Sequence, residues 1–168
     1  GNWVPAPGRA LFTAIQEALG KLPIIAEDLG IITPDVVELR EAFSFPGMRI
    51  LQFAFSETAD NAFLPHNYSP CTVAYTGTHD NDTVLGWWSS ATEREQAFAR
   101  IYLGGEEPQS HWAMIRAVVA SVAQTVIVPM QDVLGLDGRH RMNTPGQLGA
   151  WHWRFAWDWL DHATTETL

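Results

Sequence analysis

The stretch "CTVAYTGTHDND", Cys71 to Asp82, decides the fold and raises the question of function. Residues 72–76 are apolar or β-branched and are typical of a buried strand. Four polar side chains follow the strand at once: His79, Asp80, Asn81 and Asp82. In proteins with parallel sheets, functional groups lie at the carboxyl ends of the strands. The stretch therefore predicts an α/β fold with a site at this point.

Composition excludes several classes of protein. The chain has 168 residues, of which 46% are hydrophobic, so we expect a globular chain with a sizeable core. Its formal net charge of -9 and scattered basic residues argue against nucleic-acid binding. No apolar run reaches the roughly 18 residues of a membrane span. The single cysteine, Cys71, fits a reducing, cytoplasmic compartment and is expected to be a small core residue.

Strands and helices alternate along the chain, which is typical of parallel βα units. Strands are predicted at Pro23–Ala26, Met48–Phe53, Thr72–Thr76 and Thr125–Pro129. Helices are predicted at Pro7–Leu19 and Pro34–Phe43, and a third begins near Asp82. A fourth starts at the Thr92–Glu95 capping box and runs to about Leu103. The last two are predicted at Gln109–Val122 and Trp151–Leu160. Asp82 is the expected N-cap of its helix, and a long loop covers Ala54–Pro70.

Each predicted strand ends in polar residues. Glu27 ends the first strand, Gln52 the second, His79 and Asp80 follow the third, and Gln131 and Asp132 follow the fourth. This recurrence is stronger evidence for a site than any one motif, because the carboxyl ends of parallel strands meet at one edge. Asp132 is nevertheless expected to be structural rather than catalytic.

Six motifs, in order along the chain, closely resemble the amylomaltase family of the α-amylase clan, which are 4-α-glucanotransferases or disproportionating enzymes. They are "AEDLGIITPDV", "PGMRILQFAF", "LPHNY", "YTGTHDNDT", "QDVL" and "RMNTPG". The similarity runs from Trp3 to about Arg154. It implies a (β/α)8 barrel, retaining transfer of α-1,4-glucan segments between maltooligosaccharides, and no cofactor or metal.

The resemblance also implies roles for individual residues. Glu27 matches the acid/base, and Asp80 matches a carboxylate that orients the sugar ring. His79 and Asn143 match residues that contact sugar, and Gln52 and Asn81 are further candidates for substrate binding. Elementary chemistry agrees with these roles: retaining transfer needs two carboxyl groups about 5 Å apart, and the acid needs a poorly solvated place. The apolar Ile24–Ala26 segment is expected to supply that place for Glu27.

The chain departs from the family in one respect. A full barrel takes about 250 residues, and the family's nucleophile is an aspartate in an Arg-x-Asp pattern that this sequence lacks. The resemblance therefore implies the carboxyl-terminal half of the barrel, strands five to eight over residues 1–168. The missing amino-terminal half is the expected partner, and the Ile24–Ile25 and Val126–Val128 strands are expected to have open edges.

Two other functions stay open at this point. His66, His79, Asp80 and Asp82 would suit a metal-dependent hydrolase, although no recognised ligand motif such as H-E-x-x-H is present. A non-catalytic maltooligosaccharide-binding module would use tryptophan faces. Trp87 and Trp88 are expected to pack in the core, Trp151 and Trp153 are undecided, and His66 and Asn67 either line the cleft or order the long loop.

Overall fold

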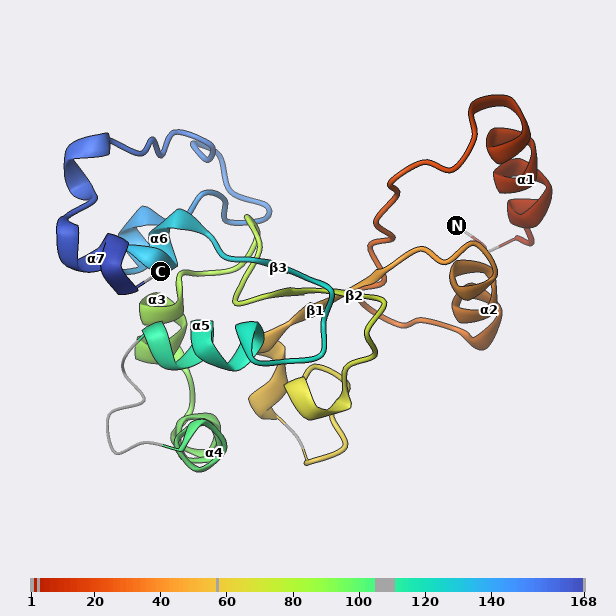
Figure 1. Cartoon of the computed structure of the whole chain (residues 1–168). Coiled ribbons are helices and arrows are strands. Elements are labelled where there is room, and N and C mark those ends of the chain that lie inside the picture. The colour runs from red at the N-terminus through yellow and green to blue at the C-terminus, as the bar shows by residue number, and fades with distance from the viewer. Residues whose placement is uncertain (1, 3, 57, 105–110, 168) are drawn as a thin grey trace. The chain divides into compact units, whose positions relative to one another are not determined.

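The computed structural model describes residues 2, 4–56, 58–104 and 111–167 (Figure 1). The chain falls into two compact units, Gly1–Met48 and Arg49–Leu168, which are described separately. None of the described helices is long and apolar enough to cross a membrane.

The first unit contains two helices around an aromatic cluster. Helix α1 (Gly8–Leu19) ends at Gly20, as predicted, and α2 (Pro34–Ala42) begins with a proline after an extended Thr33. The ring of Phe12 lies 5.4 Å from that of Phe43 and 5.0 Å from that of Phe45, between centroids.

The strand predicted at Pro23–Ala26 is wrong. This segment is extended, and Ala26 N donates to Pro46 O (2.9 Å), but the described residues form no ladder there. An apolar run shows that a segment is suited to a strand, whereas a strand also needs a partner along its length.

A three-stranded sheet has the order β1 (Gly47–Ile50), β2 (Thr72–Tyr75), β3 (Thr125–Ile127). Strands β2 and β3 are parallel, with Val73 opposite Thr125 and Tyr75 opposite Ile127, so the predicted α/β class with a parallel sheet is confirmed. Strand β1 stops at Ile50, earlier than predicted, because the 3-10 helix η1 (Leu51–Ser56) follows it.

The second unit has five α-helices among its described residues: α3 (Val84–Ser90), α4 (Glu93–Leu103), α5 (His111–Val119), the short α6 (Met130–Val133) and α7 (His162–Thr167). Short 3-10 turns cover Pro65–Asn67 (η2), Gly138–His140 (η3) and Trp157–Trp159 (η4).

The observed helix caps and starts agree with the sequence predictions in some places and differ in others. The capping box of Thr92 and Glu95 is present, as predicted. Asp82 is not the N-cap of α3; Thr83 is, and its Oγ1 accepts from Gly86 N (3.0 Å). The helix predicted from Gln109 starts at His111 in the described chain, Gln109 itself lying outside it.

The helix predicted at Trp151–Leu160 is wrong, since the segment is irregular apart from η4. Trp151 has a φ of 68°, which a right-handed helix does not allow.

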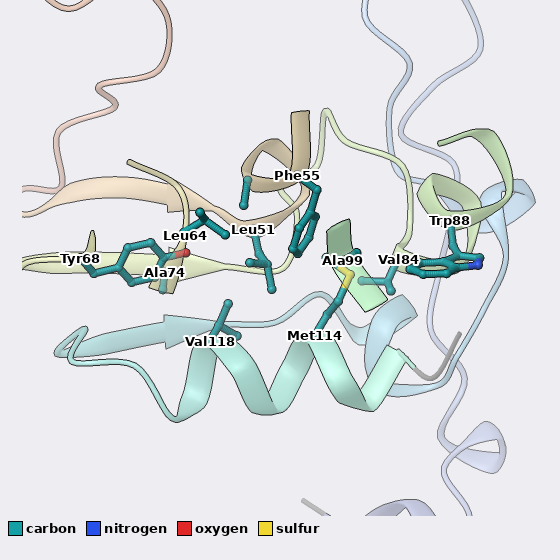
Figure 2. Close-up of a cluster of buried hydrophobic side chains, with 11 residues drawn as sticks. Leu51, Phe55, Leu64, Tyr68, Ala74, Val84, Trp88, Ala99, Met114 and Val118 are labelled. Atoms are coloured by element: carbon teal, nitrogen blue, oxygen red, sulfur yellow. The ribbon is translucent and has the colours of Figure 1, made fainter. Parts of the chain in front are cut away.

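The core of the second unit is a set of buried side chains between the sheet, η1 and the helices. Figure 2 shows Met114 and Val118 pointing from α5 toward the strands and η1. Trp88 belongs to this core and is 8% exposed, so its predicted packing role is confirmed. The cluster comprises Leu51, Ala54, Phe55, Leu64, Tyr68, Ala74, Val84, Trp88, Ala99, Met114 and Val118.

Candidate functional site

A tight turn follows β2 and presents His79 and Asp80 to solvent. Asn81 Oδ1 accepts from Thr78 N and from Thr78 Oγ1, both at 2.8 Å, and Asp80 N donates to Thr78 Oγ1 (3.3 Å). These short-range bonds close the turn on itself. The side chains of His79 and Asp80 are left 53% and 50% exposed, with His79 Nε2 3.4 Å from Asp80 Oδ1.

The segment Arg141–Asn143 docks onto this turn. Asn143 N donates to His79 O (3.1 Å), and Asn143 Nδ2 donates to Asp80 Oδ1 (2.6 Å). Arg141 Nη2 donates to Asp80 O (3.0 Å), and its Nη1 lies 3.5 Å from Asp82 Oδ2. Three of the predicted site residues, His79, Asp80 and Asn143, are thus brought together, and Arg141 is a further member that no prediction named. The sequence could have indicated Arg141, because it stands only two residues before Asn143.

One oxygen of the Asp80 carboxylate stays open to a ligand. Oδ1 is held by Asn143, whereas no donor within the described chain reaches Oδ2. A carboxylate in this state accepts hydrogen bonds from hydroxyl groups. Asn143 Nδ2 and His79 Nε2 both lie on the Oδ1 side of the carboxylate, and Arg141 holds the main-chain oxygen of the same residue.

A buried carboxylate fixes both ends of the segment that carries the site. Thr76 Oγ1, at the end of β2, donates to Asp132 Oδ2 (2.6 Å), and Val84 N, at the start of α3, donates to Asp132 Oδ1 (2.7 Å). Asp132 is 1% exposed, and burial raises its pKa, while the two hydrogen bonds oppose that rise. Its role here is structural, as the sequence predicted.

The side chains of Gln52 and Asn81 stabilise the turn by hydrogen bonds. Gln52 is buried and its Nε2 donates to Asp82 O (2.8 Å); a Cβ on Gly77 would lie 2.6 Å from that nitrogen, so a larger residue there would displace the Gln52 amide. Asn81 Oδ1 is already engaged by Thr78. Sugar contact by these two residues stays a prediction, because their main polar groups serve the turn.

Glu27 belongs to the first unit, Gly1–Met48. Its neighbours are anchored: Ala26 N donates to Pro46 O (2.9 Å), and Asp28 Oδ1 accepts from Met48 N (2.6 Å). The apolar surroundings expected for Glu27 are not found, because Glu27 is exposed and Ile25 beside it is 46% exposed. An apolar sequence neighbour points its side chain elsewhere in an extended segment.

A cavity of about 370 Å³ lies within the loop that follows Arg139. Arg141, Asn143 and Trp151 line it, and the Trp151 and His79 ring centroids are 5.1 Å apart. Trp153 also lines it, and its Nε1 is buried without a hydrogen-bond partner among the described residues. The cavity therefore combines polar and aromatic groups next to Asp80.

His66 and Asn67 order the long loop. His66 Nε2 and Asn67 Nδ2 each lie 2.9 Å from Ala59 O, and His66 Nδ1 lies 2.9 Å from Tyr102 Oη. The described residues hold no group of three or more His, Cys, Asp or Glu placed to bind a metal ion. The geometry therefore gives no support to the metal-dependent hydrolase.

The fold and the site define a class: an α/β protein with polar and aromatic groups gathered beyond the carboxyl end of a parallel strand. The 4-alpha-glucanotransferase family model, glycoside hydrolase family 77, matches residues 1–160. The chain belongs to this family.

Relatives and a solved structure agree with this assignment. The chain is 53% identical to a chloroplastic/amyloplastic 4-alpha-glucanotransferase of Arabidopsis thaliana, over 92% of the chain and 27% of the relative. It is 50% identical to a 4-alpha-glucanotransferase of Thermus thermophilus, over 92% of the chain and 33% of the relative. It superposes on an amylomaltase of Streptococcus agalactiae in complex with acarbose with a TM-score of 0.94 at 40% identity, over 99% of this chain and 34% of that one. The chain thus spans about a third of the length of these proteins.

Proposed function

We propose that the protein carrying this chain is a 4-α-glucanotransferase that transfers α-1,4-glucan segments between maltooligosaccharides with retention of configuration. The observation that carries the proposal is the half-exposed Asp80, held by Asn143 and flanked by His79, in a chain of the 4-alpha-glucanotransferase family. A related amylomaltase in complex with acarbose adds support for an oligosaccharide as ligand.

Asp80 orients the sugar ring in this proposal. Its free Oδ2 accepts from a ring hydroxyl, while Asn143 and His79 keep the carboxylate in place and offer further polar contacts. A hydrogen bond to an ionised group is stronger than one between neutral groups. Asp80 therefore binds the ring without itself attacking the anomeric carbon.

Glu27 supplies the acid and base. It protonates the leaving oxygen and later activates the acceptor hydroxyl, as retaining chemistry requires of one of its two carboxyl groups. For this, Glu27 and Asp80 must converge on one cleft at the carboxyl ends of the strands. Coordinates of the full-length protein with the two carboxyl groups beyond the reach of one sugar ring would refute the pairing.

The nucleophile lies outside these 168 residues in this proposal, and so does the amino-terminal half of the (β/α)8 barrel. Strand β3 fits that arrangement, because it pairs with β2 alone among the described strands and Ile127 is 43% exposed. A cytoplasmic location also stays a prediction.

Disproportionation of maltotriose tests the activity. The full-length protein is incubated with maltotriose, and glucose and longer maltodextrins are separated and measured. We expect both products, with Asp80→Asn reducing their formation strongly. A full-length protein that binds maltotriose without product formation would support the non-catalytic sugar-binding module instead.

A further inference from the structure

Trp151 adopts a backbone conformation that its side chain disfavours. Its φ is 68°, and only Ser44 and Trp151 among the described non-glycine residues have positive φ. A bulky residue in the left-handed region is strained, and such strain persists where the surroundings impose it, often at functional sites. Glycine would adopt this conformation freely, as Gly146 and Gly149 do in the same loop.

The strained residue closes the loop at its base. Trp151 N donates to Met142 O (2.8 Å), and the next residue, Asn143, donates from its N to His79 O (3.1 Å). The loop from 142 to 151 is thereby tied to the turn that carries His79 and Asp80. The left-handed conformation at 151 accompanies this closure.

The indole ring lies against the His79 ring. Their centroids are 5.1 Å apart with a 37° angle between the planes, which is within the range of attractive aromatic pairs. His79 Nε2 also lies 3.4 Å from Asp80 Oδ1. The imidazole therefore contacts both the indole of Trp151 and the carboxylate that the proposed function assigns to sugar orientation.

We propose that Trp151 is a positioning residue, which fixes the His79 ring beside Asp80 so that both meet the same glucosyl unit. This inference rests on the proposed function. The side chain of His79 is half-exposed, and no hydrogen bond from the described chain orients its ring other than the contact with Asp80. The contact with the indole restricts the orientation of the His79 ring, and this restriction explains why a strained tryptophan stands at 151.

The test uses the full-length protein with single and double substitutions. Trp151→Leu removes the aromatic face, Trp151→Gly removes it and relieves the backbone strain, and Trp151→Phe keeps an aromatic ring. His79→Ala and Trp151→Leu/His79→Ala complete a double-mutant cycle. Trp157→Leu is the matched control, because Trp157 is 79% exposed and its ring contact is with Phe155.

Two readouts are measured. The first is the NMR shift of the His79 imidazole protons, which the indole ring current displaces in the wild type and not in Trp151→Leu. The second is kcat and KM for maltotriose. We expect Trp151→Leu and Trp151→Gly to lose kcat/KM by a similar factor, roughly 2- to 13-fold for an aromatic pair, with Trp151→Phe retaining more. The double variant should be no worse than His79→Ala.

Other outcomes would overturn the inference about Trp151 or the proposed function. Additive losses in the double variant would show that Trp151 contacts the sugar itself, and they would overturn the inference. So would a wild-type protein without the ring-current shift, or a Trp151→Leu variant as active as Trp157→Leu. A wild type that transfers no glucan would instead refute the proposed function, and with it the role of Trp151.

Discussion

Asn143 Nδ2 lies 2.6 Å from Asp80 Oδ1, although 63 residues separate the two in the sequence. Two loops, one after β2 and one beyond η3, meet at this bond. We expect Asn143→Ala to weaken maltotriose binding by on the order of tenfold, because the bond to a charged group is lost. Asn143→Asp should weaken it further, since it sets a second carboxylate against Asp80.

Calorimetric titration of the full-length variants with maltotriose measures this effect. Gln124→Glu is the control, because it makes the same change from amide to carboxylate at an exposed position. Equal affinities for Asn143→Asp and wild type would show that Asp80 does not depend on Asn143.

Glu27→Gln in the full-length protein should remove most transfer activity and leave glucan binding largely in place. A glutamine cannot donate the proton that the leaving oxygen needs, and general acid catalysis typically contributes about 10²–10⁴-fold. Initial rates of disproportionation measure the loss, and Glu17→Gln controls for the change of charge. Transfer at nearly the original rate would assign the proton to another group.

Asp132→Asn should make the free energy of unfolding less dependent on pH. Burial raises the pKa of Asp132 above its ordinary value of 3.8, so the folded chain holds this proton more tightly than the unfolded chain. The associated stability is present below pH 3.8 and is lost as pH rises through the raised pKa. The wild type should therefore lose stability relative to Asp132→Asn across that window.

Urea unfolding of both proteins at a series of pH values checks this difference. Asp158→Asn, at an exposed carboxylate, is the control. A difference between Asp132→Asn and wild type that is constant with pH, or that moves in the opposite direction, would contradict the prediction.

Thr92→Ala should lower the free energy of unfolding by about 1 kcal/mol. Thr92 Oγ1 accepts from Glu95 N (3.3 Å), and Glu95 Oε2 accepts from Thr92 N (2.8 Å), so alanine breaks one half of the capping box. Thr92→Ser keeps the hydroxyl and should retain most of the stability. Equal losses in both variants would trace the effect to the methyl group instead.

Local signals in the sequence predicted the local structure well. The Thr92–Glu95 box and the Gly20 helix stop depend on neighbours within a few residues, and both are present. The Trp151–Leu160 helix prediction was wrong because the backbone of Trp151 bonds to Met142 and its ring packs on His79, and helical periodicity reveals neither contact.

The sequence predicted which residues form the candidate site better than it predicted how they are arranged. His79, Asp80 and Asn143 were named from motifs, and the structure brings them together. The bonds of Asp132 to Thr76 and Val84 span 56 and 48 residues, so only the folded chain shows that this carboxylate supports the turn. The exposure of Glu27 was missed because extended segments alternate the direction of their side chains.

The isolated 168 residues should transfer no glucan, although we propose that the full-length protein does. Double displacement needs a covalent glycosyl–enzyme intermediate, and in the proposed mechanism the nucleophile is supplied from outside this chain. In that mechanism Glu27 is needed to protonate the leaving oxygen, and Asp80, held by Asn143, orients the ring, so neither replaces the nucleophile. An open cleft would also admit water, which favours hydrolysis over transfer.

Purified chain is incubated with maltotriose, alone and with the separately produced amino-terminal half of its full-length protein. We expect no glucose or longer maltodextrins from the chain alone, and partial recovery of transfer when the second half completes the barrel. A second half whose candidate nucleophilic aspartate is replaced by asparagine is the control, because it should restore the barrel without activity. Robust disproportionation by the 168 residues alone would mean that one of their own carboxylates attacks the anomeric carbon, and the roles of Glu27 and Asp80 would then have to be reassigned.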